Sequence, residues 1–248
     1  MYIRLTQTEE PLDPETVDAA CAGGPPVRWL AMAGIAAPIW FTALVILQGL
    51  LQPDYGHVAM PISALAAWPL GWVQRLNFFV FGGLMAAFAV GICRAVQPGR
   101  GGMARGLLLT SGAGVVLAGL SSWSRSADGG FVEPIAHTVG AFMTFLGAGG
   151  GLVALSRRMA RDPGWRSLSA YTLACGVTML VLFPAMGALA MRDGAPLRGV
   201  AGLLQRLILL VWFPCTLVLA TRLLRLDGRP ARWPAPGSSS AAPRSPRP

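Results

Sequence analysis

Long apolar stretches alternate with short polar turns along most of the chain. Each stretch continues for about 20 residues with almost no charge, which is the length that a helix needs to cross about 30 Å of hydrocarbon. The turns contain helix-breaking combinations such as Gln52-Pro53-Asp54 and Asp128-Gly129-Gly130. The pattern predicts an all-α fold, a polytopic transmembrane helical bundle. Six spans are expected, at residues 29–51, 76–94, 105–123, 135–155, 167–191 and 199–222.

The composition agrees with a membrane protein. Of the 248 residues, 54% are hydrophobic and 12% are charged, and the charged share is roughly half that of a soluble domain. All basic residues are arginine, so chemistry through a lysine Schiff base is excluded. We therefore expect a multi-pass protein of the cell membrane that contacts membrane lipids and no nucleic acid. The oligomeric state is left open.

The two ends of the chain differ in composition from its middle. Residues 1–27 are acidic, and residues 226–248 are rich in Arg, Pro and Ser. Neither end has enough apolar residues to offset the entropy that ordering would cost. We expect two disordered tails on either side of one six-helix domain over residues 28–225.

Arginine is distributed unevenly between the predicted loops. Fifteen arginines lie in the N-terminal segment, the second and fourth loops and the C-terminal tail, whereas four lie in the first, third and fifth loops. Arginine-rich loops are retained in the cytoplasm. We therefore predict that both termini are cytoplasmic and that the first, third and fifth loops face outside.

Small residues recur at a spacing of four within several spans. Helices in lipid associate by close approach of their backbones, which small side chains allow. The faces that we expect at helix contacts carry Gly83, Ala87 and Gly91 on the second span, Gly114 and Ala118 on the third, and Gly147 and Gly151 on the fourth.

Polar residues that are uncommon in membrane spans gather near the predicted outer face. Ionisable residues inside a membrane are costly, and they indicate a function or a buried partner. The candidates for ligand binding are Arg75, Arg125, Arg206, His57 and Gln205. The candidates for acid–base chemistry are Asp54, Asp128, Glu133 and His137.

Arg206 is the most distinctive of these residues, because it lies about 10 Å inside the sixth span if that span begins near Gly199. Its partner is either an acid of the third loop, Asp128 or Glu133, or an anionic lipid head group or phosphate from outside. The guanidinium fork suits both kinds of partner. We favour the internal ion pair.

Glu133 and His137 form a second local group. Pro134 suits the first turn of a helix, and a spacing of four places both side chains on one side of it. A carboxylate beside an imidazole suits proton transfer, but a helix start with an interfacial histidine is the more common explanation. The chain has only two histidines and no nearby cysteine, so neither a metal site nor a cofactor is expected.

Several short motifs follow one another over residues 29–225. They are Asp54-Tyr55-x-His57-Val58, Ile62-Ser63-x-Leu65, Gly71-Trp72, Asn77-Phe78, Gly82-Gly83, Asp128, His137 and Gln205-Arg206. In this order they resemble a prokaryotic membrane-protein family known as domain of unknown function 998. The resemblance implies an integral membrane protein of six helices with polar residues near one face, and it implies no established reaction. Ala64 and Ala141 depart from the family pattern, which commonly has an acidic residue and a second histidine there.

Two functional hypotheses follow from the polar residues. The first is a non-enzymatic membrane protein that binds, or helps to move, a lipid or other amphiphile through the three candidate arginines. The second is a membrane enzyme that acts on a lipid or isoprenoid, with the four acid–base candidates at its site. The chain has neither a nucleotide-binding loop nor a Gly-x-Ser-x-Gly motif. We favour the first hypothesis, and a structural or channel role is the remaining alternative.

Overall fold

The computed structural model describes residues 26–96, 102–192 and 194–227. Its long helices are α2 (Val27–Leu50), α3 (Gly71–Ala95), α4 (Gly102–Leu120), α5 (Ile135–Met159), α6 (Arg166–Ala190) and α7 (Ala201–Asp227). These six helices are long and apolar enough to cross a membrane. The predicted all-α bundle with six spans is therefore confirmed. The predicted tails lie outside the described residues, except for a few positions at their inner ends.

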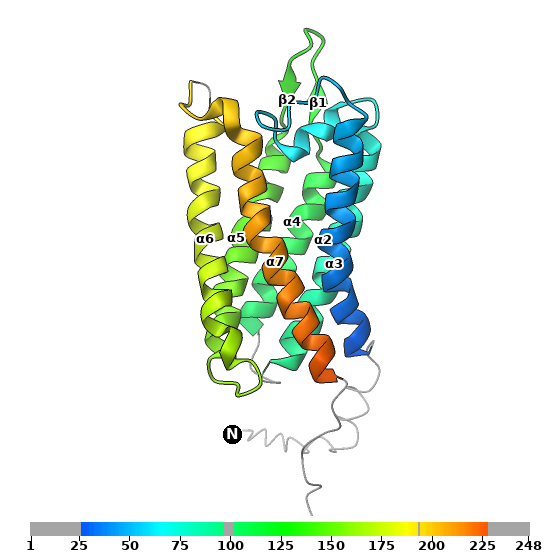
Figure 1. Ribbon diagram of the computed structural model, residues 1–248. Coiled ribbons are helices and arrows are strands. Elements are labelled where there is room, and N and C mark those ends of the chain that lie inside the picture. The colour runs from blue at the N-terminus through cyan, green and yellow to red at the C-terminus, as the bar shows by residue number, and fades with distance from the viewer. Residues whose placement is uncertain (1–25, 97–101, 193, 228–248) are drawn as a thin grey trace, which may run out of the picture.

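The helices form a closed ring in which each packs against the next along the chain (Figure 1). Consecutive helices are neighbours in the ring and run antiparallel to each other (Figure 1). The last helix, α7, packs against the first, α2, and closes the ring. These two helices lie close together at the end that carries Val27 and Asp227, and they diverge towards the other end (Figure 1).

The diverging end carries the short elements, and we call it the hairpin end. It contains the 3-10 helices η1 (Ile62–Ala67) and η2 (Arg198–Val200) and the strands β1 (Ser124–Arg125) and β2 (Phe131–Val132). The two strands pair antiparallel, with Arg125 opposite Phe131. Gly129 turns the hairpin with a φ of 83°, which glycine adopts without steric cost. That the hairpin end faces outside stays a prediction.

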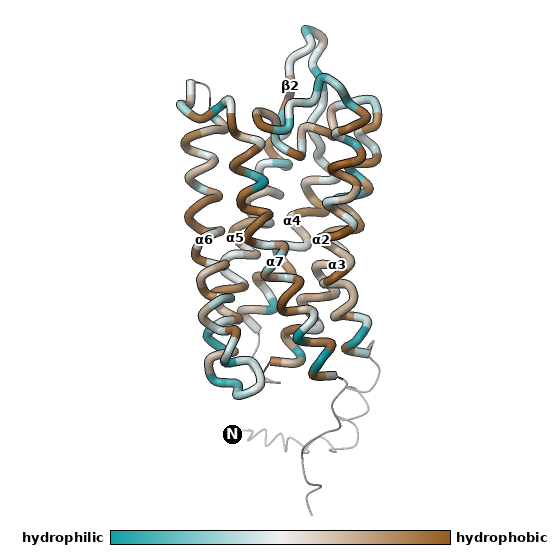
Figure 2. The backbone as a smooth tube through the Cα atoms, in the orientation of Figure 1, coloured by the Kyte–Doolittle hydropathy of each residue, from teal (hydrophilic) through white to brown (hydrophobic). Residues whose placement is uncertain are grey.

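The hydropathy of the surface fits a bundle immersed in lipid. Figure 2 shows hydrophilic residues gathered at the two ends of the bundle and apolar residues between them. Large apolar side chains such as Ile39, Val181 and Leu210 are exposed on the outside of the helices. Lipid tails are as apolar as leucine, so this exposure has no hydrophobic cost in a membrane.

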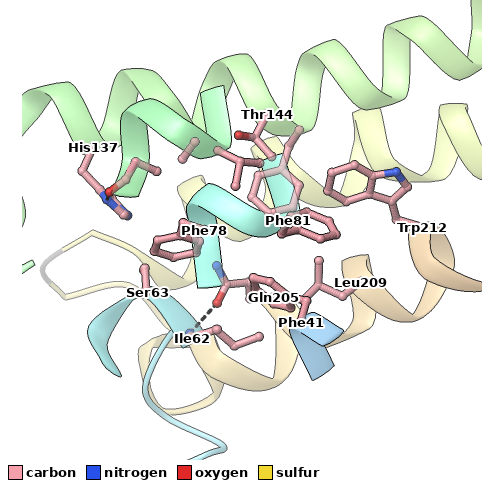
Figure 3. A pocket seen from close by; sticks show the side chains of 14 residues that line it. Phe41, Ile62, Ser63, Phe78, Phe81, His137, Thr144, Gln205, Leu209 and Trp212 are labelled. Atoms are coloured by element: carbon pink, nitrogen blue, oxygen red, sulfur yellow. Dashed lines mark hydrogen bonds between the residues drawn. The ribbon is translucent and has the colours of Figure 1, made fainter. Parts of the chain in front are cut away.

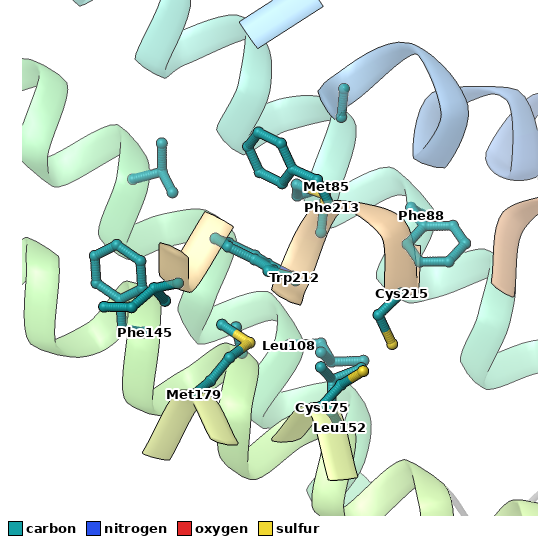
Figure 4. Packing of buried hydrophobic residues seen from close by; sticks show 14 of the residues in the cluster. Met85, Phe88, Leu108, Phe145, Leu152, Cys175, Met179, Trp212, Phe213 and Cys215 are labelled. Carbon is teal, nitrogen blue, oxygen red and sulfur yellow. The ribbon is translucent and has the colours of Figure 1, made fainter. Parts of the chain in front are cut away.

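The core between the helices is centred on Trp212 of α7 (Figure 4). Its ring centroid lies 5.6 Å from that of Phe81 and 6.2 Å from that of Phe145, both in edge-to-face arrangements. Such arrangements place the positive edge of one ring against the negative face of another. Aromatic packing thus holds α3, α5 and α7 together in the middle of the bundle.

Glycines bring neighbouring helix backbones into contact. A Cβ atom placed on Gly114 of α4 would lie 2.6 Å from the carbonyl oxygen of Gly140 on α5. The expected contact face on α4 is therefore confirmed. On α3 the prediction was wrong for Gly83, which is exposed and has no atom within 4 Å of its Cβ position. The preceding Gly82 makes the contact instead, against the backbone of Gly112.

Candidate functional site

A groove of about 690 Å³ runs between α2 and α7 on the outside of the bundle. Its walls are residues 38–46 of α2, residues 206–217 of α7, and Ile62 of η1. Arg206 is the one charged residue in its lining. At 1.5 Å per residue the α7 wall is about 16 Å long, which is roughly half of the hydrocarbon thickness of a bilayer.

The guanidinium of Arg206 lies at the hairpin end of this groove and holds the loop between α2 and η1. Its Nη1 donates hydrogen bonds to the carbonyl oxygens of His57 at 2.6 Å and Gly202 at 3.0 Å, and lies 3.4 Å from that of Met60. Its Nη2 donates to the hydroxyl of Tyr55 at 3.0 Å and lies 3.3 Å from Nδ1 of His57. One side chain thus joins α7 to a loop far away in the sequence.

Tyr55 is the central residue of that loop, and it is only 4% exposed. Its hydroxyl donates a hydrogen bond that is shared between the carbonyl oxygens of Met60 at 3.2 Å and Pro61 at 3.1 Å. Burial raises the pKa of Tyr55 above its ordinary value of 10.0, although the hydrogen bond and charge of Arg206 act in the opposite direction. The phenol therefore stays protonated at neutral pH. Sequence reasoning did not select Tyr55, although it lies inside the motif with His57.

The ion pair that we expected between Arg206 and an acid of the third loop is wrong. Asp128 lies exposed in the hairpin turn, where it accepts a hydrogen bond from Ser126. Glu133 accepts one from Thr138 at 3.1 Å. The guanidinium donates its hydrogen bonds to carbonyl groups of the first loop instead. The loop can lie this close to α7 because Gly202 has no side chain. A Cβ atom there would lie 2.7 Å from the carbonyl oxygen of His57.

Arg206 therefore keeps a positive charge that no described carboxylate contacts. Its hydrogen-bond partners are backbone carbonyls, a phenol and an imidazole nitrogen. Within the described residues its Nε–H has no partner. An ionisable residue of this kind inside a membrane-spanning helix is costly and indicates a functional site.

A smaller cavity of about 60 Å³ lies inside the bundle, next to the groove (Figure 3). Phe41, Ile62 and Leu209 belong to the linings of both spaces and form the wall between them. The other side chains around the cavity are mainly aromatic and aliphatic, with polar groups from Ser63, His137, Thr144 and Gln205.

Residues 35–222 match the family described as Protein of unknown function (DUF998). This stretch is more than half of the chain. The chain belongs to the DUF998 family. The match covers residues of all six helices of this DUF998 protein and confirms the resemblance seen in its motifs. Comparisons with curated proteins and with solved structures give no match.

The other candidate arginines of the DUF998 protein lie apart from Arg206. Arg125 packs over the ring of Trp68 at 4.1 Å and over that of Phe131 at 5.2 Å, both cation–π contacts of the hairpin end. Arg75 is exposed near the start of α3. Neither lines the groove or the cavity. The structure therefore does not bring the three arginines together at one pocket.

The acid–base candidates are also separated from one another. Glu133 precedes α5, which begins at Ile135, so the helical spacing of four does not apply to it and His137. His137 turns inwards, and its Nδ1 lies 3.0 Å from the carbonyl oxygen of Ala118. Asp54 is exposed in the first loop. No group of three His, Cys, Asp or Glu side chains that could hold a metal occurs among the described residues.

Proposed function

We propose that this DUF998 protein binds an anionic amphiphile of the membrane, with the chain in the groove between α2 and α7 and the head group at Arg206. The observation that carries the proposal is the lining of the groove. Apart from Thr42 it is apolar along its length, and it has one charged residue, at the hairpin end. A lipid has the same arrangement, with a polar head group at one end of an apolar chain.

The length of the groove supports a chain from one leaflet. The α7 wall extends for about 16 Å, and one leaflet contributes about half of a hydrocarbon layer of about 30 Å. A chain that moves from lipid into the groove is already out of water, so its burial adds little hydrophobic free energy. Selectivity must therefore come mainly from the head group.

The charge of Arg206 supplies that selectivity. The guanidinium is always protonated, and its planar fork matches carboxylate and phosphate oxygens. Its Nε–H is free for a ligand within the described residues, and the exposed His57 lies beside it. An anionic head group at this position neutralises a charge that the protein itself leaves without a carboxylate.

Native mass spectrometry of the purified protein with an equimolar mixture of phosphatidylglycerol and phosphatidylcholine, with identical chains, tests the proposal. We expect the anionic lipid to be retained about tenfold more strongly, as one charge-assisted hydrogen bond allows. The variant Arg206→Gln should lose this preference. Equal retention of both lipids by the unmodified protein contradicts the proposal.

A second pair of variants tests the groove without changing any charge. Ala43 lines the groove and is exposed, so Ala43→Trp places a bulky side chain in the groove. Ala174 is exposed on α6, outside the lining of the groove, so Ala174→Trp is the matched control. We expect Ala43→Trp to lose the bound lipid and Ala174→Trp to keep it. Retention by both variants would place the lipid elsewhere on the bundle.

The enzyme hypothesis has no comparable observation in its favour. The acid–base candidates lie in the first loop, in the hairpin turn, before α5 and in the wall of the cavity. We prefer the binding proposal for this reason.

A further inference from the structure

Three polar groups around the inner cavity have no hydrogen-bond partner within the described residues. Ser63 is 7% exposed and its hydroxyl is unpaired. Gln205 accepts a hydrogen bond from the backbone N–H of Ile62 at 2.6 Å. A backbone N–H only donates, so this bond fixes the amide oxygen, and the NH₂ group of Gln205 is left without a partner.

His137 supplies the third group. It is 3% exposed, and its Nδ1 faces the carbonyl oxygen of Ala118 at 3.0 Å. A carbonyl only accepts, so Nδ1 carries a proton, and in the neutral ring Nε2 is then an acceptor. Figure 3 shows Ser63, His137 and Gln205 reaching the cavity from η1, α5 and α7.

The three groups together match a hydroxyl. The Gln205 NH₂ group donates to an oxygen, the His137 Nε2 accepts a proton from it, and the Ser63 hydroxyl does either. An ether or a ketone has no proton to donate and would leave His137 unpaired. The cavity lining contains no Asp, Glu or Arg, and a buried charge without a partner is costly. The complementary ligand is therefore uncharged.

The size of the cavity limits the rest of the ligand. A volume of about 60 Å³ has room for about four water molecules, but each buried water needs about three hydrogen bonds. The three free groups satisfy only one or two waters. The remaining space adjoins Phe41, Phe81 and Trp212, and these apolar walls favour carbon over water.

We infer that the cavity is a binding site for an uncharged aliphatic alcohol, with the hydroxyl among Ser63, Gln205 and His137 and a short carbon chain against the aromatic walls. Phe41, Ile62 and Leu209 line both the cavity and the groove, so only these side chains separate the cavity from the membrane side of the bundle. The inference is independent of the proposed lipid site, because no charged group takes part in it.

Crystals of the protein soaked with 2-bromoethanol test the inference, since bromine is located by its anomalous scattering. This probe has four heavy atoms, and 1-bromopropane is its matched control with a methyl group in place of the hydroxyl. We expect a bromine peak in the cavity with 2-bromoethanol and about tenfold lower apparent affinity for 1-bromopropane. Equal occupancy by both probes, or no peak in the cavity, overturns the inference.

Variants separate ligand binding from folding. The Ser63 hydroxyl has no protein partner to lose, so Ser63→Ala should fold and should bind 2-bromoethanol about tenfold more weakly. Thr144 lines the same cavity, but its hydroxyl donates to the carbonyl oxygen of Gly140 at 2.8 Å. Thr144→Val should therefore bind 2-bromoethanol as the unmodified protein does. Unchanged binding by Ser63→Ala overturns the inference.

The lipid proposal and this inference fail separately. Ala43→Trp, at a position outside the lining of the cavity, should lose the bound lipid and keep the bromine peak. Ser63→Ala should weaken the bromine peak and keep the lipid preference. Loss of the bromine peak in Ala43→Trp would overturn the independence of the two sites and with it the present assignment.

Discussion

Arg206 donates a hydrogen bond of 3.0 Å to the hydroxyl of Tyr55, across 151 positions of sequence. The phenol in turn donates towards the carbonyl oxygens of the following segment. The loop beside the groove therefore takes its shape from a cation on the last helix. The position of the loop between α2 and η1 and the positive charge at the groove therefore both depend on Arg206.

Replacing Arg206 by leucine should lower the free energy of unfolding by about 2 kcal/mol, because carbonyl groups of the first loop and the Tyr55 hydroxyl lose a charged donor. Thermal unfolding in lipid-free detergent measures the effect. The double variants with Asp128→Asn or Glu133→Gln should be no more stable than the single variant. Recovery of stability in either double variant would restore the ion pair that the structure argues against.

Gly114→Ala should lower the free energy of unfolding by about 1–3 kcal/mol, because the new methyl group meets the backbone of α5 and neither helix can move aside without disturbing the core. Gly106 lies on the same helix with no atom within 4 Å of its Cβ position. Gly106→Ala is the control and should leave stability unchanged or raise it by up to about 1 kcal/mol. Similar losses in both variants would show that the effect does not come from helix contact.

Asp128 should titrate below its ordinary pKa of 3.8, because its carboxylate accepts hydrogen bonds. The largest contribution comes from the Ser126 hydroxyl, and backbone N–H groups of the turn add to it. A pKa that is lower in the folded state stabilises the hairpin fully above the ordinary value, and this contribution is lost as the pH falls through the folded pKa. Carbon-13 NMR of the aspartate carboxyl groups measures the titration. Ser126→Ala should bring the pKa back towards 3.8, and an unchanged titration would contradict the assigned cause.

A reporter fused after Arg225 should be found in the cytoplasm, and one inserted near Gly129 should be found outside. The reason is the excess of arginine in the N-terminal segment, in the second and fourth loops and in the C-terminal segment of the sequence. The measurement is the activity of paired reporters that work on only one side of a membrane. The reverse result would place the groove mouth and Arg206 on the cytoplasmic side.

The sequence predicted the spans well, because each span is a long apolar run and needs no knowledge of its neighbours. Its largest errors were the end of α7, which was placed at residue 222, whereas the helix ends at Asp227, and the start of α3, which was placed at residue 76, whereas the helix begins at Gly71. Gln74 and Arg75 interrupt the apolar run there, but polar side chains do not interrupt a helical backbone. The two-residue strands of the hairpin have no periodicity that a sequence pattern reveals.

The candidate site was predicted only in part. His137, Gln205 and Arg206 do line the two pockets, because polar residues in apolar spans are conspicuous. The partners of Arg206 were not found, because the acceptors are mostly backbone carbonyls, and residue types do not reveal where those lie. Ser63 and Tyr55 were missed as site residues because their role depends on how the first loop folds back onto α7.

The groove lies where the first and last helices of the bundle meet. During synthesis the chain is made from its N-terminus, so α2 enters the membrane before all the other helices of the ring and α7 after them. A nascent chain with five helices inserted has only one wall of the groove and lacks Arg206. It also lacks Gln205, Leu209 and Trp212, which the inner cavity needs. Both pockets therefore come into existence with the insertion of α7, and a chain truncated before that helix keeps five apolar helices but has neither pocket.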